Sequence, residues 1–133
     1  YQGPYRFQKH FFSGVGELES KGEEFECARS IDTLPQVKHW VRNLATRPQT
    51  SFWLPTSTDR FYPDFVAELQ DGCILVIEYK GEHLADTQDT KEKRNVGQLW
   101  AEKSEGKGLF LMAEKRDAQG RDTRAQILAL AGH

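Results

Sequence analysis

A chain of 133 residues has the length of one domain and can bury roughly two-thirds of the surface that its unfolded form exposes. Hydrophobic residues make up 38% of the chain and charged residues 29%, which excludes a disordered segment. The net charge of -2 excludes a polybasic adaptor for membranes or nucleic acids, although it leaves room for a local basic patch.

The absence of targeting signals and the pattern of cysteines exclude further classes of protein. No apolar run approaches the ~20 residues that a membrane-spanning helix needs, and no signal peptide is visible. The first residue is Tyr1, so we expect the chain to be a piece of a longer protein. Cys27 and Cys73 lie among apolar neighbours, which favours two free thiols in a cytoplasmic protein over a disulfide between them. Without a CxxC or HExxH motif, no zinc or thioredoxin-type site is predicted.

The first third of the chain predicts an arm and a helix. Residues 1–16 are aromatic and interrupted by Gly and Pro, which indicates an irregular arm that continues from a preceding domain. Residues 17–133 are then a single domain. Its first element is a helix over residues 17–32, weakened by Gly22, whose apolar face carries Leu18, Phe25, Ala28 and Ile31.

The acidic residues of this helix fall on two sides. Glu23 and Glu26 are predicted to face solvent, whereas Glu24 lies on the inward side between Ala28 and Ile31. An inward carboxylate needs a partner on the adjacent sheet. Glu17 shares the inward face and stays a second candidate for that position.

Strands dominate the middle of the chain. After a turn at Pro35, alternation predicts a strand over residues 37–43, and residues 51–55 predict a short strand. Residues 61–69 and 73–81 predict a β-hairpin around an Asp-Gly turn.

The C-terminal part predicts a helix, a buried strand and a last helix. The first helix covers residues 87–104, with Val96, Leu99 and Trp100 on its apolar face. A strand over 108–115 follows, and the last helix is capped by Asp122 and Gly132. The predicted fold is α/β with a mixed sheet in the order α-β-β-β-α-β, an N-terminal arm and a C-terminal helix.

The hairpin brings charged residues together. If Gln70-Asp71-Gly72 forms a three-residue turn closed by Gly72 in the left-handed conformation, Asp64 lies opposite Glu78. Lys80 then shares their face, while the other face, from Phe61 and Phe65 to Tyr79, is a core face. A slip of one residue would separate the two carboxylates, so this prediction depends on the turn.

Two adjacent carboxylates repel each other and resist joint ionisation. A bound divalent cation removes that conflict, and hard oxygen ligands with retained waters suit Mg²⁺. Lys80 would lie close to an attacking water or to a substrate phosphate. The predicted chemistry is metal-assisted hydrolysis of a phosphodiester.

The same residues resemble a known motif. Tyr62-Pro63-Asp64, followed after 13 residues by Glu78-Tyr79-Lys80, resembles the PD-(D/E)xK nuclease motif. The predicted order of elements is similar to the common core of that superfamily. Within it, the chain resembles the endonuclease domain at the C-terminal end of type III restriction enzymes and related helicase-nuclease proteins. The segments that carry this resemblance are EEFECARSID, VKHWVRN, FYPDFVAEL, LVIEYKG and EKRNVGQLWAEKS.

The resemblance implies roles for individual residues. Asp64 and Glu78 would be ligands of Mg²⁺, or of Mn²⁺ as a substitute, together with the main-chain carbonyl of Tyr79. Lys80 would position or activate the attacking water, and Glu24 would be the helix carboxylate. DNA is the implied substrate. The implied partners are a helicase or translocase domain in the same longer chain and a modification or specificity subunit.

DNA contacts are predicted outside the motif as well. Lys93 and Gln98 on the second helix, and Arg42 and Asn43 at a strand end, are the candidates. A solvated basic face is the competing interpretation for the helix, and the three tryptophans are predicted to be core residues. Two other functions stay open, namely a non-catalytic nuclease fold that binds DNA or acts as a scaffold, and a nuclease for RNA or for repair.

Overall fold

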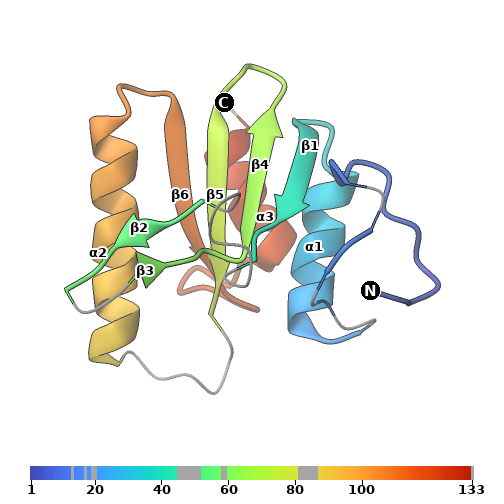
Figure 1. Ribbon diagram of the computed structural model, residues 1–133, viewed down its shortest axis with the longest axis horizontal. Coiled ribbons are helices and arrows are strands. Elements are labelled where there is room, and N and C mark those ends of the chain that lie inside the picture. Colours follow the sequence, from blue (N-terminus) through green and yellow to red (C-terminus); the bar gives the residue numbers. More distant parts are fainter. Residues whose placement is uncertain are drawn as a thin grey trace.

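A four-stranded mixed sheet with helices on both faces forms the centre of the computed structural model (Figure 1), which describes residues 1–12, 14–16, 18, 21–44, 52–57, 60–80 and 87–132. The sheet order is β1-β4-β5-β6. Neighbours are antiparallel except β5 and β6, which are parallel. The strands of this sheet are β1 (Val37–Arg42), β4 (Phe65–Leu69), β5 (Ile74–Tyr79) and β6 (Gly108–Ala113).

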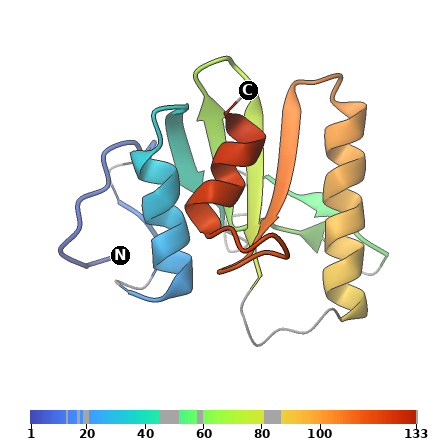
Figure 2. The same cartoon turned by 180° about the vertical axis from the view of Figure 1, so that it is seen from behind.

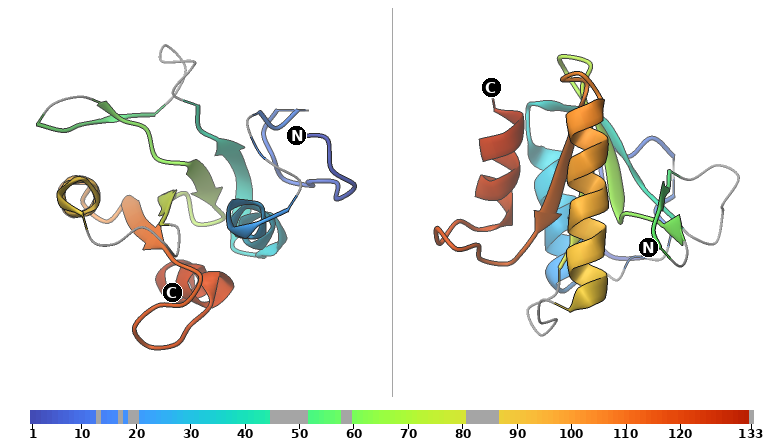
Figure 3. Two further views of the ribbon diagram at one scale, coloured as in Figure 1. Left: turned by 90° about the horizontal axis from the view of Figure 1, so that it is seen from below. Right: turned by 90° about the vertical axis from the view of Figure 1, so that its left-hand side faces the viewer.

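Three helices and a small ribbon cover the sheet. Helices α1 (Glu23–Thr33) and α3 (Thr123–Ala131) lie on one face (Figure 2). Helix α2 (Gln88–Lys103) and the paired strands β2 (Leu54–Pro55) and β3 (Arg60–Phe61) lie on the other (Figure 3). In the described part of the chain, no helix combines the length and the apolar character that a membrane crossing requires. The mixed α/β class is therefore as predicted, and the predicted order holds with the β2–β3 ribbon inserted between β1 and β4.

The hairpin register is confirmed. Phe65 pairs with Ile77, and each following pair up to Glu68 and Ile74 keeps the same register. Gly72 adopts a φ of 91°, the left-handed conformation that the three-residue turn requires, and its N–H donates to the carbonyl of Leu69 (3.0 Å).

The strand predicted over residues 61–69 is interrupted. It is divided into β3 and β4 by Tyr62-Pro63-Asp64, because Pro63 has no N–H to donate and the N–H of Asp64 donates to a side chain, Glu78 Oε1 (3.1 Å). After this break the chain changes sides. Phe61, predicted beside Phe65, packs instead with Leu54, Val76 and Phe110 on the α2 face.

The first helix begins later than predicted. Gly22 precedes it with a φ of 104°, so α1 starts at Glu23, and Glu17 lies outside the described residues. Its predicted apolar face is confirmed, because Phe25, Ala28 and Ile31 are buried, and so is Leu18 before the helix.

Two predictions about tryptophan and leucine positions are wrong. Trp53, just before β2, is 38% exposed, and Leu99 is 51% exposed on α2. Gly97 takes the inward position on α2, since a side chain there would meet the buried ring of Phe110 at 2.5 Å. The α3 caps at Asp122 and Gly132 are as predicted, and Cys27 and Cys73 are free thiols.

The N-terminal arm is tied to the domain through Asp32, which is 2% exposed. The Asp32 carboxylate accepts hydrogen bonds from Tyr5 Oη (2.8 Å), Trp40 Nε1 (2.9 Å) and the main-chain N–H groups of Gln8 and Lys9 (2.9 and 2.8 Å). Burial opposes its ionisation, but these hydrogen bonds, with Trp40 first, outweigh it and lower the pKa of Asp32.

Asp32→Asn is therefore expected to lower the free energy of unfolding at pH 7 by about 2–4 kcal/mol, because an amide cannot accept all of these hydrogen bonds. A lowered pKa in the folded state stabilises the fold above the unfolded value of 3.8, and this contribution disappears as pH falls through the folded pKa. Urea unfolding at pH 7 and at a pH below the folded pKa of Asp32 should show the deficit only at the higher pH. Glu26→Gln, an exposed carboxylate on the same helix, is the matched control, and an equal deficit in both variants would contradict this role of Asp32.

Candidate functional site

Charged side chains gather at one end of the central sheet. Because β1, β5 and β6 run in one direction and β4 in the other, the last residues of the first three lie beside the first residues of β4. The first turns of α1 and α2 approach the same end, which faces the viewer in the left panel of Figure 3. We call this end of the sheet the acidic edge, after Asp64 and Glu78.

Two hydrogen bonds join Asp64 to the end of β5. The N–H of Asp64 donates to Glu78 Oε1 (3.1 Å), and the N–H of Tyr79 donates to Asp64 Oδ2 (2.8 Å). Asp64 and Glu78 are therefore neighbours across the hairpin, as predicted, although the paired residues of β4 and β5 begin only at Phe65 and Ile77.

Glu78 lies in an environment that disfavours its charge. Its side chain is only 16% exposed, and burial, followed by the nearby Asp64 carboxylate, raises the pKa of Glu78 to about 9. Lys93 Nζ, 3.8 Å from Glu78 Oε2, opposes the shift without cancelling it. Burial is the larger cause, and the repulsion between neighbouring carboxylates that the sequence predicted adds to it.

Helix α1 adds a third carboxylate through an arginine. Arg42, whose side chain is 10% exposed, contacts Glu24 Oε1 through Nη2 (2.7 Å) and Asp64 Oδ1 through Nη1 (3.1 Å). Burial, followed by the charge of Asp64, raises the pKa of Glu24, whereas Arg42 lowers it. Glu24 therefore lies at the acidic edge as predicted, and Arg42 is engaged by carboxylates instead of being presented at a DNA-facing surface.

Glu23 was predicted to face solvent, and that prediction is wrong. Its Oε1 accepts a hydrogen bond from Tyr79 Oη (2.9 Å). The helical pattern could not show this contact, because the tyrosine reaches α1 from the core face of β5.

Lys80 lies at the same edge beside Glu78. Both side chains line a cavity of about 120 Å³ between the end of β5 and the start of α2, together with Lys93 and Asp89. Lys80 Nζ is 3.5 Å from Glu114 Oε1, a residue directly after β6 that the sequence analysis did not single out. The only sequence signal for Glu114 is its place after a buried strand parallel to β5.

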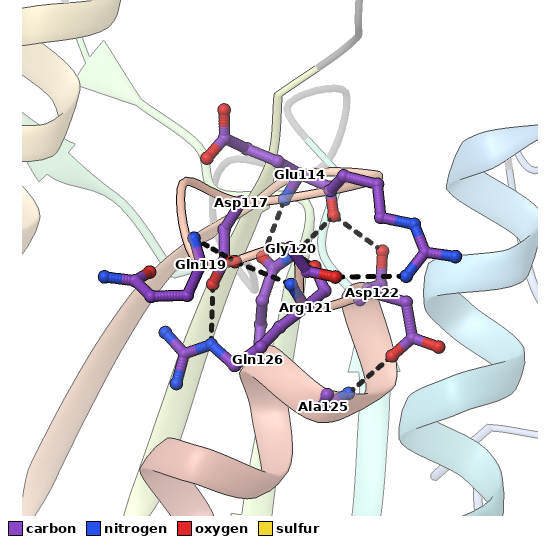
Figure 4. Close-up of polar contacts among 10 residues, drawn as sticks. Glu114, Asp117, Gln119, Gly120, Arg121, Asp122, Ala125 and Gln126 are labelled. Carbon is purple, nitrogen blue, oxygen red and sulfur yellow. Dashed lines mark hydrogen bonds and ion pairs between the residues drawn. The ribbon is translucent and has the colours of Figure 1, made fainter.

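A network of hydrogen bonds fixes the main chain of Glu114 (Figure 4). The buried side chain of Gln126 accepts from the Glu114 N–H (2.9 Å) and donates to its carbonyl (2.7 Å) and to that of Arg121 (3.0 Å). Asp117 closes the intervening loop with an ion pair to Arg121 (2.7 Å). The carboxylate that faces Lys80 is thus attached to a rigid main chain.

The other predicted DNA contacts have different surroundings. Lys93 reaches the acidic edge, 3.3 Å from Asp89 as well as near Glu78, and Gln98 is exposed on α2. Asn43 is buried, and its side-chain amide donates to the carbonyls of Phe52 (2.7 Å) and Pro63 (2.9 Å). The structure therefore gives Asn43 a structural role instead of the predicted contact with DNA.

The carboxylate oxygens at the acidic edge suit a hard cation that binds only a few protein groups and keeps water as its other ligands. Among the described residues, no three Asp, Glu, His or Cys side chains are arranged to hold a metal ion. Mg²⁺ commonly takes only one or two carboxylates and keeps several waters. The opposed carboxylates of Asp64 and Glu78 fit that requirement.

Comparisons with protein-family models, with curated proteins and with solved structures found no match to this chain.

Proposed function

We propose that this chain is a Mg²⁺-dependent endonuclease domain that hydrolyses phosphodiester bonds in DNA. The observation that carries the proposal is the cross-strand pair of Asp64 and Glu78, with Lys80 beside Glu78 in one cavity. Two carboxylates and an amine in this arrangement suit the cleavage of a charged ester, because one cation and one ammonium group can offset the charge that develops on the phosphate.

The proposal includes a PD-(D/E)xK core. Its support is the order α1-β1-β4-β5-α2-β6, in which β4 and β5 form the hairpin that carries the motif and β6 adds in parallel. The α1 carboxylate Glu24 reaches the same edge through Arg42.

Asp64 and Glu78 would hold the cation, together with the main-chain carbonyl of Tyr79, and Mn²⁺ would substitute for Mg²⁺. When bound, the cation supplies a Lewis acid that polarises a phosphoryl oxygen. Lys80 then orients the attacking water or the phosphate, and Glu114 limits where its ammonium group can lie. Lys93 and Arg42 neutralise part of the carboxylate charge before a cation binds.

We further propose that the domain belongs to a longer protein with a DNA translocase or helicase, and works with a modification or specificity subunit. The net charge of -2 supports this, because strong DNA affinity needs many phosphate-neutralising contacts that other domains would supply.

A second candidate function is a non-catalytic nuclease fold that binds DNA or acts as a scaffold. It is favoured by one observation, namely that Arg42 and Lys93 already form ion pairs with Asp64 and Glu78, so the carboxylates have protein partners without a metal. A third candidate is a nuclease with the same catalytic residues whose substrate is RNA or a DNA repair intermediate.

Cleavage of a supercoiled plasmid distinguishes these functions. Wild-type protein, alone and in the full-length chain, should nick or linearise the plasmid with Mg²⁺ or Mn²⁺ and not with EDTA. Asp64→Asn, which keeps the size of the side chain but removes a charged ligand, should lose cleavage by at least about 100-fold. Metal-dependent cleavage that is equal in wild type and Asp64→Asn would show that the activity comes from elsewhere. A structured RNA tested in parallel identifies the substrate.

A further inference from the structure

The β2–β3 ribbon presents an aromatic residue and a cation to solvent. Trp53, just before β2, is 38% exposed, and the guanidinium carbon of Arg60, the first residue of β3, lies 4.4 Å from the centroid of its indole ring. A guanidinium stacked on indole keeps its donors at the edge of its plane while its position is fixed. The pair is therefore a cation held in one place at the surface.

The base of the ribbon is fixed to the central sheet. Asn43, directly after β1, donates through Nδ2 to the carbonyls of Phe52 and Pro63, and its Oδ1 accepts from the N–H of Phe52 (2.9 Å). Leu54 and Phe61 point inward from β2 and β3 and are buried against the sheet. The Asn43 side chain thus binds the main chain both before β2 and after β3.

The far end of the ribbon is fixed to α2. Ser57 Oγ donates to Glu92 Oε2 (2.7 Å), and the N–H of Ser57 is 3.3 Å from Oε1 of the same carboxylate. The ribbon is consequently held at both ends, and it projects from the α2 face of the sheet in the right panel of Figure 3.

The ribbon and the acidic edge are close. Lys93 Nζ lies 5.4 Å from the centroid of the Phe61 ring and 3.8 Å from Glu78 Oε2, so it connects the two. Arg60 is four residues before Asp64, which limits their Cα separation to about 14 Å. Since the axial rise per phosphate along one strand of a duplex is 3.4 Å, that distance spans at most about four phosphates.

From this arrangement we infer that the ribbon is a DNA-backbone binding element, in which Arg60 contacts a phosphate within about four nucleotides of the bond that is cut. Trp53 is a positioning residue that holds the guanidinium in place, and Asn43 keeps the ribbon in register with Asp64. The inference rests on the proposed endonuclease function for the identity of the ligand. It predicts where the substrate lies across the protein, namely over the α2 face and not over the face covered by α1 and α3.

The test is binding of a fluorescein-labelled 30-base-pair DNA duplex, measured by fluorescence anisotropy in EDTA at several salt concentrations so that no cleavage occurs. Arg60→Ala is expected to weaken binding about 3- to 10-fold at low salt and to reduce the salt slope by about one. Trp53→Ala should weaken binding with the slope unchanged, and Arg60→Lys should retain the slope with intermediate affinity. Arg29→Ala, on the outer surface of α1, removes the same charge from the opposite face and should leave both quantities unchanged.

Three results would overturn the inference: no binding of the wild-type protein at low salt, unchanged binding by Arg60→Ala, or equal weakening by Arg60→Ala and Arg29→Ala. Failure of the nuclease proposal has a different signature. If Arg60→Ala weakens binding but the wild type does not cut the duplex when Mg²⁺ is added, the ribbon binds DNA and the domain is the non-catalytic alternative. Circular dichroism of each variant checks that it is folded. The Arg60 variants decide the test, because this residue is exposed and its substitution leaves the core intact.

Discussion

Replacing Lys80 with alanine is expected to lower plasmid cleavage by about 10²- to 10³-fold while metal binding and folding are retained. Lys80 is not one of the proposed ligands, and it follows the last residue of β5. Its side chain is only 14% exposed, so circular dichroism must show that the alanine variant is folded. Lys80 lines the same cavity as Glu78, and its ammonium group lies 3.5 Å from Glu114 Oε1. We expect the phosphate to acquire charge beside this group during the reaction. Its loss removes that charge stabilisation and leaves Glu114 without its ion pair at a half-exposed position.

Single-turnover cleavage in the full-length protein, with Mn²⁺ affinity measured by calorimetry, checks this expectation. Lys107→Ala, at an exposed position before β6, is the matched control and should cleave like the wild type. Cleavage by Lys80→Ala at the wild-type rate would count against the nuclease mechanism and favour the non-catalytic alternative.

Without a divalent cation, Glu78→Gln is expected to have a larger free energy of unfolding than the wild type. With a bound cation, the wild type is expected to be the more stable of the two. The pKa of Glu78 is raised from 4.5 to about 9 in the folded protein, so between these values the folded state binds more protons than the unfolded state. Stability therefore falls as pH rises from 4.5 to 9 in the wild type, and a glutamine removes that slope. At pH 7 the gain is on the order of 1–3 kcal/mol.

A cation reverses this order. Saturating Mg²⁺ stabilises whichever protein binds it, by an amount that grows with the ratio of cation concentration to Kd. Thermal unfolding at pH 5, 7 and 9, with EDTA and with Mg²⁺, should show that the advantage of Glu78→Gln grows with pH in EDTA and disappears with Mg²⁺. If the stability of Glu78→Gln relative to the wild type depended on neither pH nor cation, Glu78 would have neither the raised pKa nor the role of a cation ligand.

The carboxylate pair could be predicted from sequence because it depends on local chemistry. Gly72 can adopt the left-handed conformation that closes a three-residue turn, and that turn alone fixes which residues oppose each other across the hairpin. Asp64, Glu78 and Lys80 followed from it directly, and Glu24 followed from the helical period.

What could not be predicted depends on contacts between segments distant in sequence. Phe61 changes faces because the chain breaks at Pro63. The proline itself signals a break, but the period of two does not show which face the residue before the break then takes. Trp53 is a large aromatic residue of the kind that is usually buried, and it is nevertheless 38% exposed, because the ribbon buries Leu54 and Phe61 against the sheet instead. Asp32 accepts hydrogen bonds from residues more than 20 positions earlier, so its role in fixing the arm had no local signal.

The proposed nuclease function requires a divalent-cation site at Asp64 and Glu78. Anomalous diffraction from crystals soaked in Mn²⁺ tests it most directly. The predicted result is an ion between the two carboxylates, at about 2.0–2.6 Å from an oxygen of each, which is absent from crystals of Asp64→Asn treated in the same way. A wild-type crystal in saturating Mn²⁺ that binds the ion elsewhere and leaves this pair without one would contradict the assignment.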